Sequence, residues 1–331
     1  MPERPGEFDL INDFFSPLAA GHAGSLGLTD DAALLAVPDG KELVVTADTL
    51  VAGVHFLETD PPAAVAQKVL AVNLSDLAAM GASPHAYTLA AAWPRDLPGD
   101  WIAGFAGGLK TAQESAEIQL VGGDTVATPG PLTLNVTALG HVDAGNALRR
   151  SGANPGDRVF VSGTIGDAAL GLGLLTDEIQ ADNEADRAFL VQRYHAPEPR
   201  NGLGQRLVEF ASAAIDVSDG LIADAGHLAK QSGVDIAIDA DRVPLSAATR
   251  HLLDGAPALS GHIFAGGDDY ELVFTVPETA LQLVAEAAAA SGTEVTEIGS
   301  VTGKTGSRGA VRLLDAKGNL MKSDKGGYRH F

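Results

Sequence analysis

The chain has 331 residues, of which 45% are hydrophobic and 20% charged, and it contains no cysteine. This length and composition predict a globular protein with room for two domains, and they exclude disulfides, thiolate metal sites and cysteine nucleophiles. The formal net charge of -21 argues against a nucleic-acid partner, because phosphate backbones are bound by basic patches.

The sequence carries no obvious targeting or membrane signal. Its first residues, "MPERPGEFDLINDFF", lack a basic region followed by an apolar core. No apolar run approaches the ~20 residues that a membrane span needs. We therefore expect a cytoplasmic protein without a membrane partner.

Helical and strand-like patterns alternate along the first half of the chain. Helices are expected over 7–19, 61–82 and 100–115, and strands over 42–48, 86–93, 118–124 and 131–142. A loop rich in glycine, asparagine and proline follows, which is typical of a domain joint. The sequence thus predicts two domains, 1–148 and 149–331.

The second half repeats this alternation. Strands are expected over 158–162, 213–217, 234–239, 270–276, 294–301 and 310–315, and helices from about 166 and over 201–212, 220–231 and 278–290. The predicted fold class is α/β, in the mixed α+β form, for both halves.

Aspartates recur beside small residues at the ends or starts of strand-like runs. They are Asp30, Asp31, Asp48, Asp124, Asp216, Asp219, Asp268 and Asp269, the last two after the apolar run "HIFAGG". Ligands gather at the carboxyl ends of strands in α/β proteins, and converging carboxylates need cations to offset their repulsion. With oxygen ligands and no cysteine, the pattern favours Mg²⁺ over zinc.

Each of these acids taken singly has a plain structural alternative, which is to cap a helix or brace a turn. Asp219 is a good candidate N-cap for the helix that follows it, and Asp269 is expected to cap or brace its turn. Asp76 is harder to explain in this way, because it lies mid-helix in "VLAVNLSDLAAMGA" with Asn73 on the same face. That polar stripe on an apolar helix indicates that the face is turned toward a site.

Several long blocks of the sequence resemble the thiamine-monophosphate kinase family, which shares a superfamily with aminoimidazole ribonucleotide synthetase. The blocks include "DDAAL", "TADTLVAGVHF", "KVLAVNLSDLAAMGASP", "LVGGDT", "RSGANPGD", "AIDVSDGLIADAGHLA" and "GGDDYELVFTVP". The resemblance implies ATP-dependent phosphorylation of thiamine monophosphate to thiamine diphosphate, assisted by several Mg²⁺ ions per active site. It further implies an N-terminal sheet with helices that pairs in a homodimer, a C-terminal α/β domain, and an active-site cleft between them.

The resemblance also implies roles for individual residues, and it implies no dedicated catalytic nucleophile. Metal ligands would be Asp31, Thr46, Asp48, Asp76, Asp124, Asp216 and Asp219. ATP contacts would be Gly123, Asp124, Arg150 and Ser218. Substrate contacts would be His55, Asp268 and Tyr328.

The sequence departs from the family pattern at Thr29, where glycine is usual, and at Asp268, where glutamate is common. Two alternatives stay open at this point. One is another ATP-dependent enzyme of the superfamily, such as aminoimidazole ribonucleotide synthetase, and the other is a non-catalytic nucleotide- or metal-binding relative.

Overall fold

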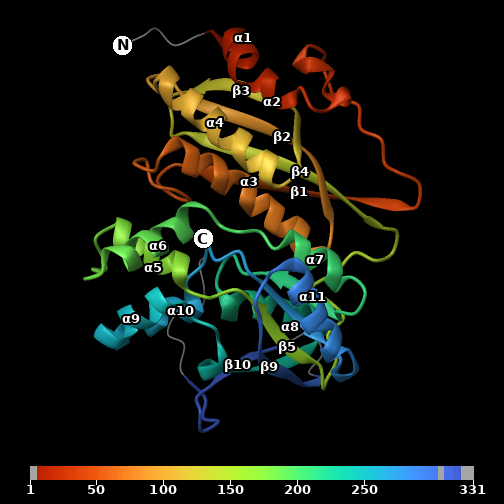
Figure 1. Ribbon diagram of the computed structural model, residues 1–331, viewed down its shortest axis with the longest axis vertical. Helices are drawn as coiled ribbons and strands as arrows, with labels where there is room; N and C mark the ends of the chain where they lie inside the picture. Colours follow the sequence, from red (N-terminus) through yellow and green to blue (C-terminus); the bar gives the residue numbers. More distant parts are fainter. Residues whose placement is uncertain (1–5, 305–308, 322–331) are drawn as a thin grey trace. The chain divides into compact units, whose positions relative to one another are not determined.

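The computed structural model describes residues 6–304 and 309–321, and the chain forms two compact units (Figure 1). The first unit comprises Met1–Leu77 and Ala82–Gly145, and the second comprises Ala78–Gly81 and Asn146–Phe331. The mixed α/β class predicted for both halves is confirmed. The predicted cleft between the domains stays a prediction.

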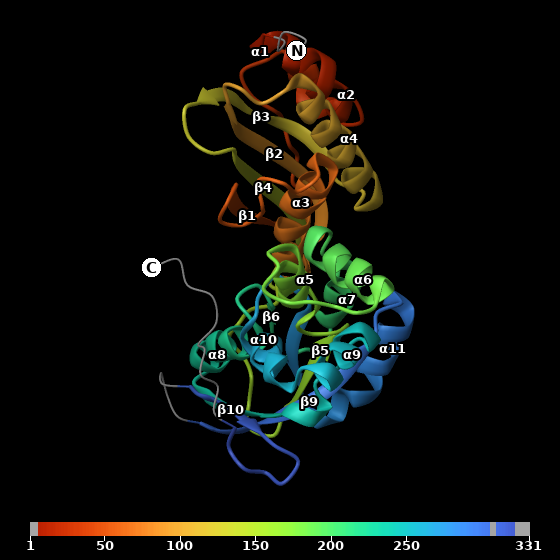
Figure 2. The same ribbon diagram turned by 90° about the vertical axis from the view of Figure 1, so that its left-hand side faces the viewer.

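The first unit is built on a four-stranded sheet of order β1-β4-β2-β3. Its strands are β1 (Lys41–Val51), β4 (Thr133–Asp143), β2 (Ser83–Pro94) and β3 (Gln119–Thr128). The pair β2–β3 is parallel and the other two pairs are antiparallel. Helices α3 (Pro62–Ala79) and α4 (Gly99–Ser115) cover one face of the sheet (Figures 1 and 2).

Helix α3 forms because a proline at its first position is followed by alanine, leucine and valine without an internal glycine. It is apolar on nearly every side and is therefore buried, with Leu70 and Leu77 fully covered. Trp93 of β2 and Phe105 of α4 pack edge to face in the same core, with ring centroids 5.7 Å apart. This packing holds α4 against β2.

The N-terminal segment also belongs to the first unit. The helix predicted over 7–19 is present as α1 (Glu7–Leu10), a π-helical turn (Ile11–Phe15) and α2 (Ser16–Ala19). A short 3₁₀ segment follows at Ala23–Leu28.

The second unit is built on a six-stranded sheet of order β10-β7-β9-β5-β8-β6. Its strands are β10 (Val311–Leu314), β7 (Val234–Asp239), β9 (Val295–Lys304), β5 (Arg158–Ser162), β8 (Leu272–Val276) and β6 (Ala213–Asp216). Only the pair β10–β7 is parallel among these described strands. The helices are α5 (Asp167–Leu175), α6 (Glu184–His195), α7 (Asn201–Leu207), α8 (Leu221–Ser232), α9 (Ala247–Gly255), α10 (Ser260–Ala265) and α11 (Leu281–Ser291).

All six strands predicted in the second half are present, but the interpretation of its helices was incomplete. Helices α6, α9 and α10 were not predicted, and α7 ends at Leu207 rather than 212. The prediction that the apolar run before Asp268 is strand-like is wrong, since Phe264 and Ala265 end helix α10. Asp268 and Asp269 therefore lie in the loop that enters β8, not at the carboxyl end of a strand.

No helix among the described residues combines the length and the apolar character needed to cross a membrane.

Candidate functional site

The first group of predicted site residues lies where β1 faces α3. Because side chains alternate along a strand, Thr46 and Asp48 share one side of β1 and are half-buried there. The Thr46 hydroxyl donates a hydrogen bond to Oδ2 of Asp76. The backbone N–H of Asp48 donates to Oδ1 of Asn73 at 3.1 Å, and Asn73 is held in turn by its Nδ2 bond to Val69 O at 3.0 Å. The polar stripe on α3 is thus turned toward β1.

The two carboxyl groups of this site act on each other. Burial, the charge of Asp76 and a hydrogen bond to Asp76 all raise the pKa of Asp48, to about 6. A cation between the carboxylates would remove this repulsion. The possible metal ligands here are the hydroxyl of Thr46 and the carboxylates of Asp48 and Asp76. All of them are oxygen ligands, which a hard cation such as Mg²⁺ prefers.

A second group of predicted residues lines a pocket of about 660 Å³ in the first unit. Asp31, Gly123 and Asp124 all contribute to its wall, as does Asn135 of β4. Nδ2 of Asn135 donates to Thr49 Oγ1 at 2.8 Å and to Asp48 O at 3.2 Å. The pocket wall is therefore bonded to the strand that carries Asp48.

The strand register nevertheless separates the two groups. Thr49, Asn135, Ala90 and Asp124 form one row across the sheet. Asp124 on β3 and Thr49 on β1 are the two ends of this row. They are three strand spacings of ~4.8 Å apart, or roughly 14 Å. Within one chain, Thr46, Asp48 and Asp76 come together, Asp31 and Asp124 share the pocket, and the two groups flank opposite edges of the sheet.

Two positions near the pocket show how the backbone accommodates the sequence. A Cβ at Gly123 would lie 1.9 Å from Leu89 O, so only glycine lets β3 approach β2 here. Thr29 has φ -110°, which any residue adopts, and its hydroxyl donates to Leu26 O at 2.8 Å. The turn before Asp31 therefore does not require the glycine that is usual in the family.

His55, a predicted substrate contact, is oriented by its own loop. Its Nδ1 accepts a hydrogen bond from the backbone N–H of Val51 at 3.1 Å, which places the proton of the neutral ring on Nε2. Its half-buried side chain thereby has a fixed tautomer.

The predicted residues of the second unit gather on the loop after β6. Asp216 is buried at the end of the strand, and Ser218 and Asp219 follow it. The backbone N–H groups of Ser218, Asp219 and Gly220 all donate to Oδ2 of Asp224, at 3.0, 2.9 and 3.1 Å. One carboxylate on α8 therefore shapes the whole turn.

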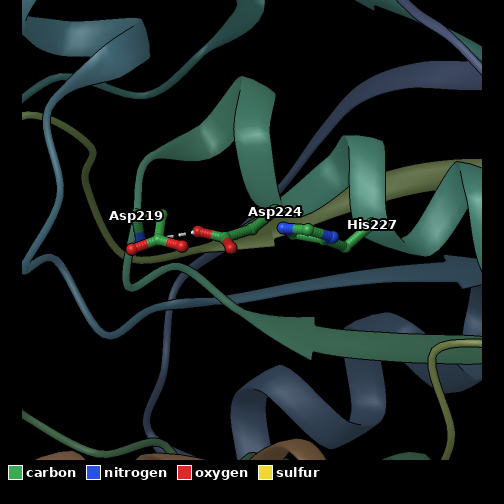
Figure 3. A group of neighbouring side chains, drawn as sticks. All are labelled: Asp219, Asp224 and His227. Carbon is green, nitrogen blue, oxygen red and sulfur yellow. Dashed lines mark hydrogen bonds between the residues drawn. The ribbon is translucent and has the colours of Figure 1, made fainter. Parts of the chain in front are cut away.

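Asp224 was missed by sequence reasoning, although an acid in the first turn of a helix is a recognisable capping signal. The N-cap position of α8 is Gly220 and carries no side-chain cap, so the alternative that Asp219 caps this helix was wrong. Burial is the largest influence on Asp224 and raises its pKa to about 7, while the three backbone bonds act in the opposite direction. Asp219, Asp224 and His227 offer oxygen and nitrogen atoms within 4.8 Å of one another (Figure 3).

A second loop, which carries Asp268, is bonded to this one. Asp268 N–H donates to Ser218 O at 2.9 Å, Tyr270 N–H to Val217 O at 2.8 Å, and Val217 N–H to Glu271 O at 2.8 Å. A Cβ at Gly267 would lie 2.2 Å from Ser218 O, so glycine is needed for this contact. Ser218, a predicted nucleotide contact, and Asp268, a predicted substrate contact, therefore sit on two joined loops.

The remaining predicted residues are less constrained or not described. Arg150 has an exposed side chain, and its carbonyl accepts from Ser232 Oγ at 3.1 Å. Tyr328 lies outside the described residues. Asp269 braces the turn as expected, because its carboxylate accepts from Gly166 N at 2.8 Å and Ala168 N at 3.4 Å.

The chain is similar to known proteins over nearly its whole length. It matches the family models of the AIR synthase related protein, with the N-terminal domain at residues 29–142 and the C-terminal domain at residues 154–312. It is 43% identical to the thiamine-monophosphate kinase of Salmonella typhimurium over 327 residues, 98% of each chain.

Solved structures agree with this match. The crystal structure of thiamine-monophosphate kinase from Stenotrophomonas maltophilia is 42% identical with a TM-score of 0.83, covering 96% of this chain and 98% of that one. The structure described as AaThiL complexed with AMPPCP and TMP is 33% identical with a TM-score of 0.78, covering 98% and 97%.

Proposed function

We propose that this chain, which belongs to the thiamine-monophosphate kinase family, transfers the γ-phosphoryl group of ATP to thiamine monophosphate and so makes thiamine diphosphate. The observation that carries the proposal is a match to these kinases at up to 43% identity over 98% of both chains. A relative of this family is known in complex with AMPPCP and TMP, which supports binding of ATP and of the monophosphate here.

The acceptor in this reaction needs little activation. A phosphate monoester has a second pKa of about 6, so its oxygen is largely ionised at pH 7 and needs no strong general base. The difficulty is to bring two polyanions into line within a protein of net charge -21. We propose direct in-line transfer without a phosphorylated protein intermediate.

Oxygen ligands for Mg²⁺ are present in both units. Thr46, Asp48 and Asp76 would form one group of metal ligands in the first unit, and Asp31 and Asp124 on the pocket would form a separate one. Asp216 and Asp219 would contribute in the second. Bound Mg²⁺ supplies neutralisation of the phosphate charges and a fixed geometry for the transferred group.

Other side chains would orient the two substrates. Gly123, Ser218 and Arg150 would contact ATP, and an arginine can bind a phosphate through two parallel N–H groups. His55 would present its Nε2–H to the substrate, because its Nδ1 already accepts from Val51. Asp268 would contact the substrate from the joined loops of the second unit.

A homodimer that forms through the N-terminal sheet, in the cytoplasm, completes the proposal. Two exposed apolar side chains on one face of the edge strand β1, Leu43 and Val45, support this assembly. Exposed apolar side chains on sheet edges are a common feature of association surfaces. Sedimentation of the purified chain would measure the oligomeric state directly.

The decisive experiment is incubation of the protein with ATP, Mg²⁺ and thiamine monophosphate, followed by chromatographic detection of thiamine diphosphate. Thiamine and an aminoimidazole ribonucleotide precursor serve as control acceptors. ATP binding without ADP formation would refute the kinase in favour of a binding protein. A radiolabelled protein intermediate that forms and decays during turnover would refute direct transfer.

A further inference from the structure

The loop Gly266–Glu271 has an unusual backbone. Asp268 and Tyr270 have φ values of 70° and 51°, the left-handed region that side chains with a Cβ seldom enter. Such conformations are unfavourable for residues with a Cβ and persist only where the surroundings impose them. The hydroxyl of Tyr270 donates to Oδ1 of Asp268 at 3.2 Å, so the two strained residues also contact each other.

The residues that alternate with this pair point inward and are tightly bound. Asp269 is 2% exposed, and Glu271 is fully buried. The carboxylate of Asp269 accepts the backbone N–H groups of Gly166 and Ala168 at the start of α5. The loop is therefore fixed from inside at every second residue.

Glu271 is the stronger of the two anchors, because it accepts four hydrogen bonds. Arg200 donates to both of its oxygens, Nε to Oε2 at 2.7 Å and Nη2 to Oε1 at 2.6 Å. Nη2 of Arg193 adds a bond to Oε1 at 2.8 Å, and the hydroxyl of Ser162 adds one to Oε2 at 2.6 Å. Its partners come from the end of β5, the end of α6 and the residue before α7.

We infer that Glu271, held by Arg193 and Arg200, is a positioning residue that keeps Asp268 and Tyr270 in their left-handed conformations ready for the phosphate acceptor. The inference rests on the proposed function and deepens it, because Asp268 is there a substrate contact. A side chain that is already oriented loses less freedom when the ligand binds, so the anchor contributes to affinity without contacting the substrate.

A purely stabilising role is the competing explanation, and the chemistry of the cluster argues against it. Buried ion pairs are weak contributors to stability, because desolvation consumes much of their attraction. Here the buried carboxylate of Glu271 accepts hydrogen bonds from two arginines and a hydroxyl. These bonds fix the orientation of the carboxylate as well as compensating its charge. The stabilising and the positioning role also predict different effects of mutation. If Glu271 positions the loop, its mutation affects binding of one substrate only, and the effect requires the Asp268 side chain.

A double-mutant cycle on Glu271→Gln and Asp268→Ala tests the inference. We expect Glu271→Gln to raise KM for thiamine monophosphate roughly tenfold, while KM for ATP and kcat stay within about twofold. In the Asp268→Ala background the same change should raise KM no further. Equal increases in both KM values, or effects that multiply in the double variant, would overturn the inference.

The matched control is Glu278→Gln. Glu278 also bonds an arginine, Arg158, at 2.8 Å, but its side chain is 68% exposed. We expect wild-type KM values for both substrates. A rise in KM for thiamine monophosphate equal to that of Glu271→Gln would show that loss of any arginine partner has this effect, and would overturn the inference.

Hydrogen exchange provides a readout that does not depend on activity. Glu271→Gln should speed exchange of the Asp268 and Tyr270 amides and leave those of α11 unchanged, even if the protein proves to have another substrate. Arg200→Lys keeps the charge but loses the two-point contact, and it should give a smaller change of the same kind if Glu271→Gln does not fold. Unchanged exchange at both amides in a folded variant would refute the positioning role.

Discussion

Asp48 in the first unit and Glu271 in the second are acids that the chain treats in opposite ways. In the first unit, burial and the neighbouring Asp76 both oppose ionisation of Asp48, and its pKa rises to about 6. In the second unit, Glu271 is more deeply buried but meets two arginines and a hydroxyl from the chain itself. Asp224 accepts three backbone N–H groups, yet burial and the charge of Asp219 still raise its pKa to about 7.

The difference separates acids whose charge the chain itself compensates from acids that await a ligand. A buried carboxylate that the protein compensates can serve a structural purpose at modest cost. Carboxylates that raise one another's pKa are a feature of functional sites. By this criterion the β1–α3 group and the Asp219–Asp224 pair are the places to look for metal, and Glu271 is a support.

The largest effect should come from Asp76→Asn. Loss of one charge from the metal site should lower kcat/KM by about 1,000-fold, or roughly 4 kcal/mol of transition-state stabilisation, with the fold intact. The melting temperature should hold or rise, because Asp48 no longer faces a charged neighbour. Steady-state kinetics and thermal unfolding measure the two effects, with the exposed Asp143→Asn as control. Unchanged turnover at saturating Mg²⁺ would remove Asp76 from the site.

Arg200→Ala should give the next largest effect, but on stability. It leaves Glu271 buried with only part of its compensation, so the free energy of unfolding should fall by about 3 kcal/mol. Denaturant unfolding monitored on the second unit measures this loss. The exposed Arg158→Ala is the control and should cause no measurable change. If Arg200→Ala lowered the free energy of unfolding as little as Arg158→Ala, the contrast between compensated and uncompensated acids would be wrong.

Mg²⁺ itself should stabilise the protein by an intermediate amount. A ligand at a hundred times its Kd adds about 2.7 kcal/mol when it binds only the folded state. We expect Mg²⁺ to raise the melting temperature, EDTA to reverse the rise, and Asp76→Asn to reduce it. Glu271→Gln should keep the full rise, since Glu271 is not a ligand. A rise that survives in Asp76→Asn would place the metal elsewhere.

The smallest effect concerns three histidines of the first unit. His85 packs against His141 and His22, with ring centroids 4.4 and 5.4 Å apart, and Lys41 lies near His141. Burial and then the neighbouring rings lower the pKa of His85 below its ordinary 6.5. The folded state therefore prefers the neutral ring, and this contribution to stability is full above pH 6.5 and lost as the pH falls below it.

His85→Phe keeps a ring in this stack that cannot be protonated. The variant should lose less stability than the wild type between pH 7 and pH 5, and thermal unfolding at several pH values measures the difference. Parallel pH profiles for the two proteins would show that the cluster is not the cause.

The sequence predicted strands better than helices, for a physical reason. Strands such as β5 and β7 are short apolar runs between turn residues, and their bounds were found correctly. Helices α6 and α9 are more polar and were missed, although their caps could have been noticed. Asn183 accepts from Ala185 N–H at 2.9 Å, and Ser246 accepts from Thr249 N–H at 3.0 Å.

The candidate site was predictable in part. Residue type and local context singled out Asp48 and Asp76, because each is an acid in an apolar segment. The partners of Glu271 could not be found in this way. Arg200 lies 71 residues before it, and only the packing of α6, α7 and β8 brings the charges together.

The glycine pair before Asp268 affects how variation in this protein should be interpreted. A Cβ at Gly266 would meet His262 O at 2.3 Å, and one at Gly267 would meet Ser218 O at 2.2 Å. In a saturation mutagenesis screen both positions should be as intolerant as a metal ligand, although neither has a side chain to offer a substrate. A position in this loop can therefore be intolerant to substitution because two backbone segments lie too close for a Cβ, and not because its residue takes part in the reaction.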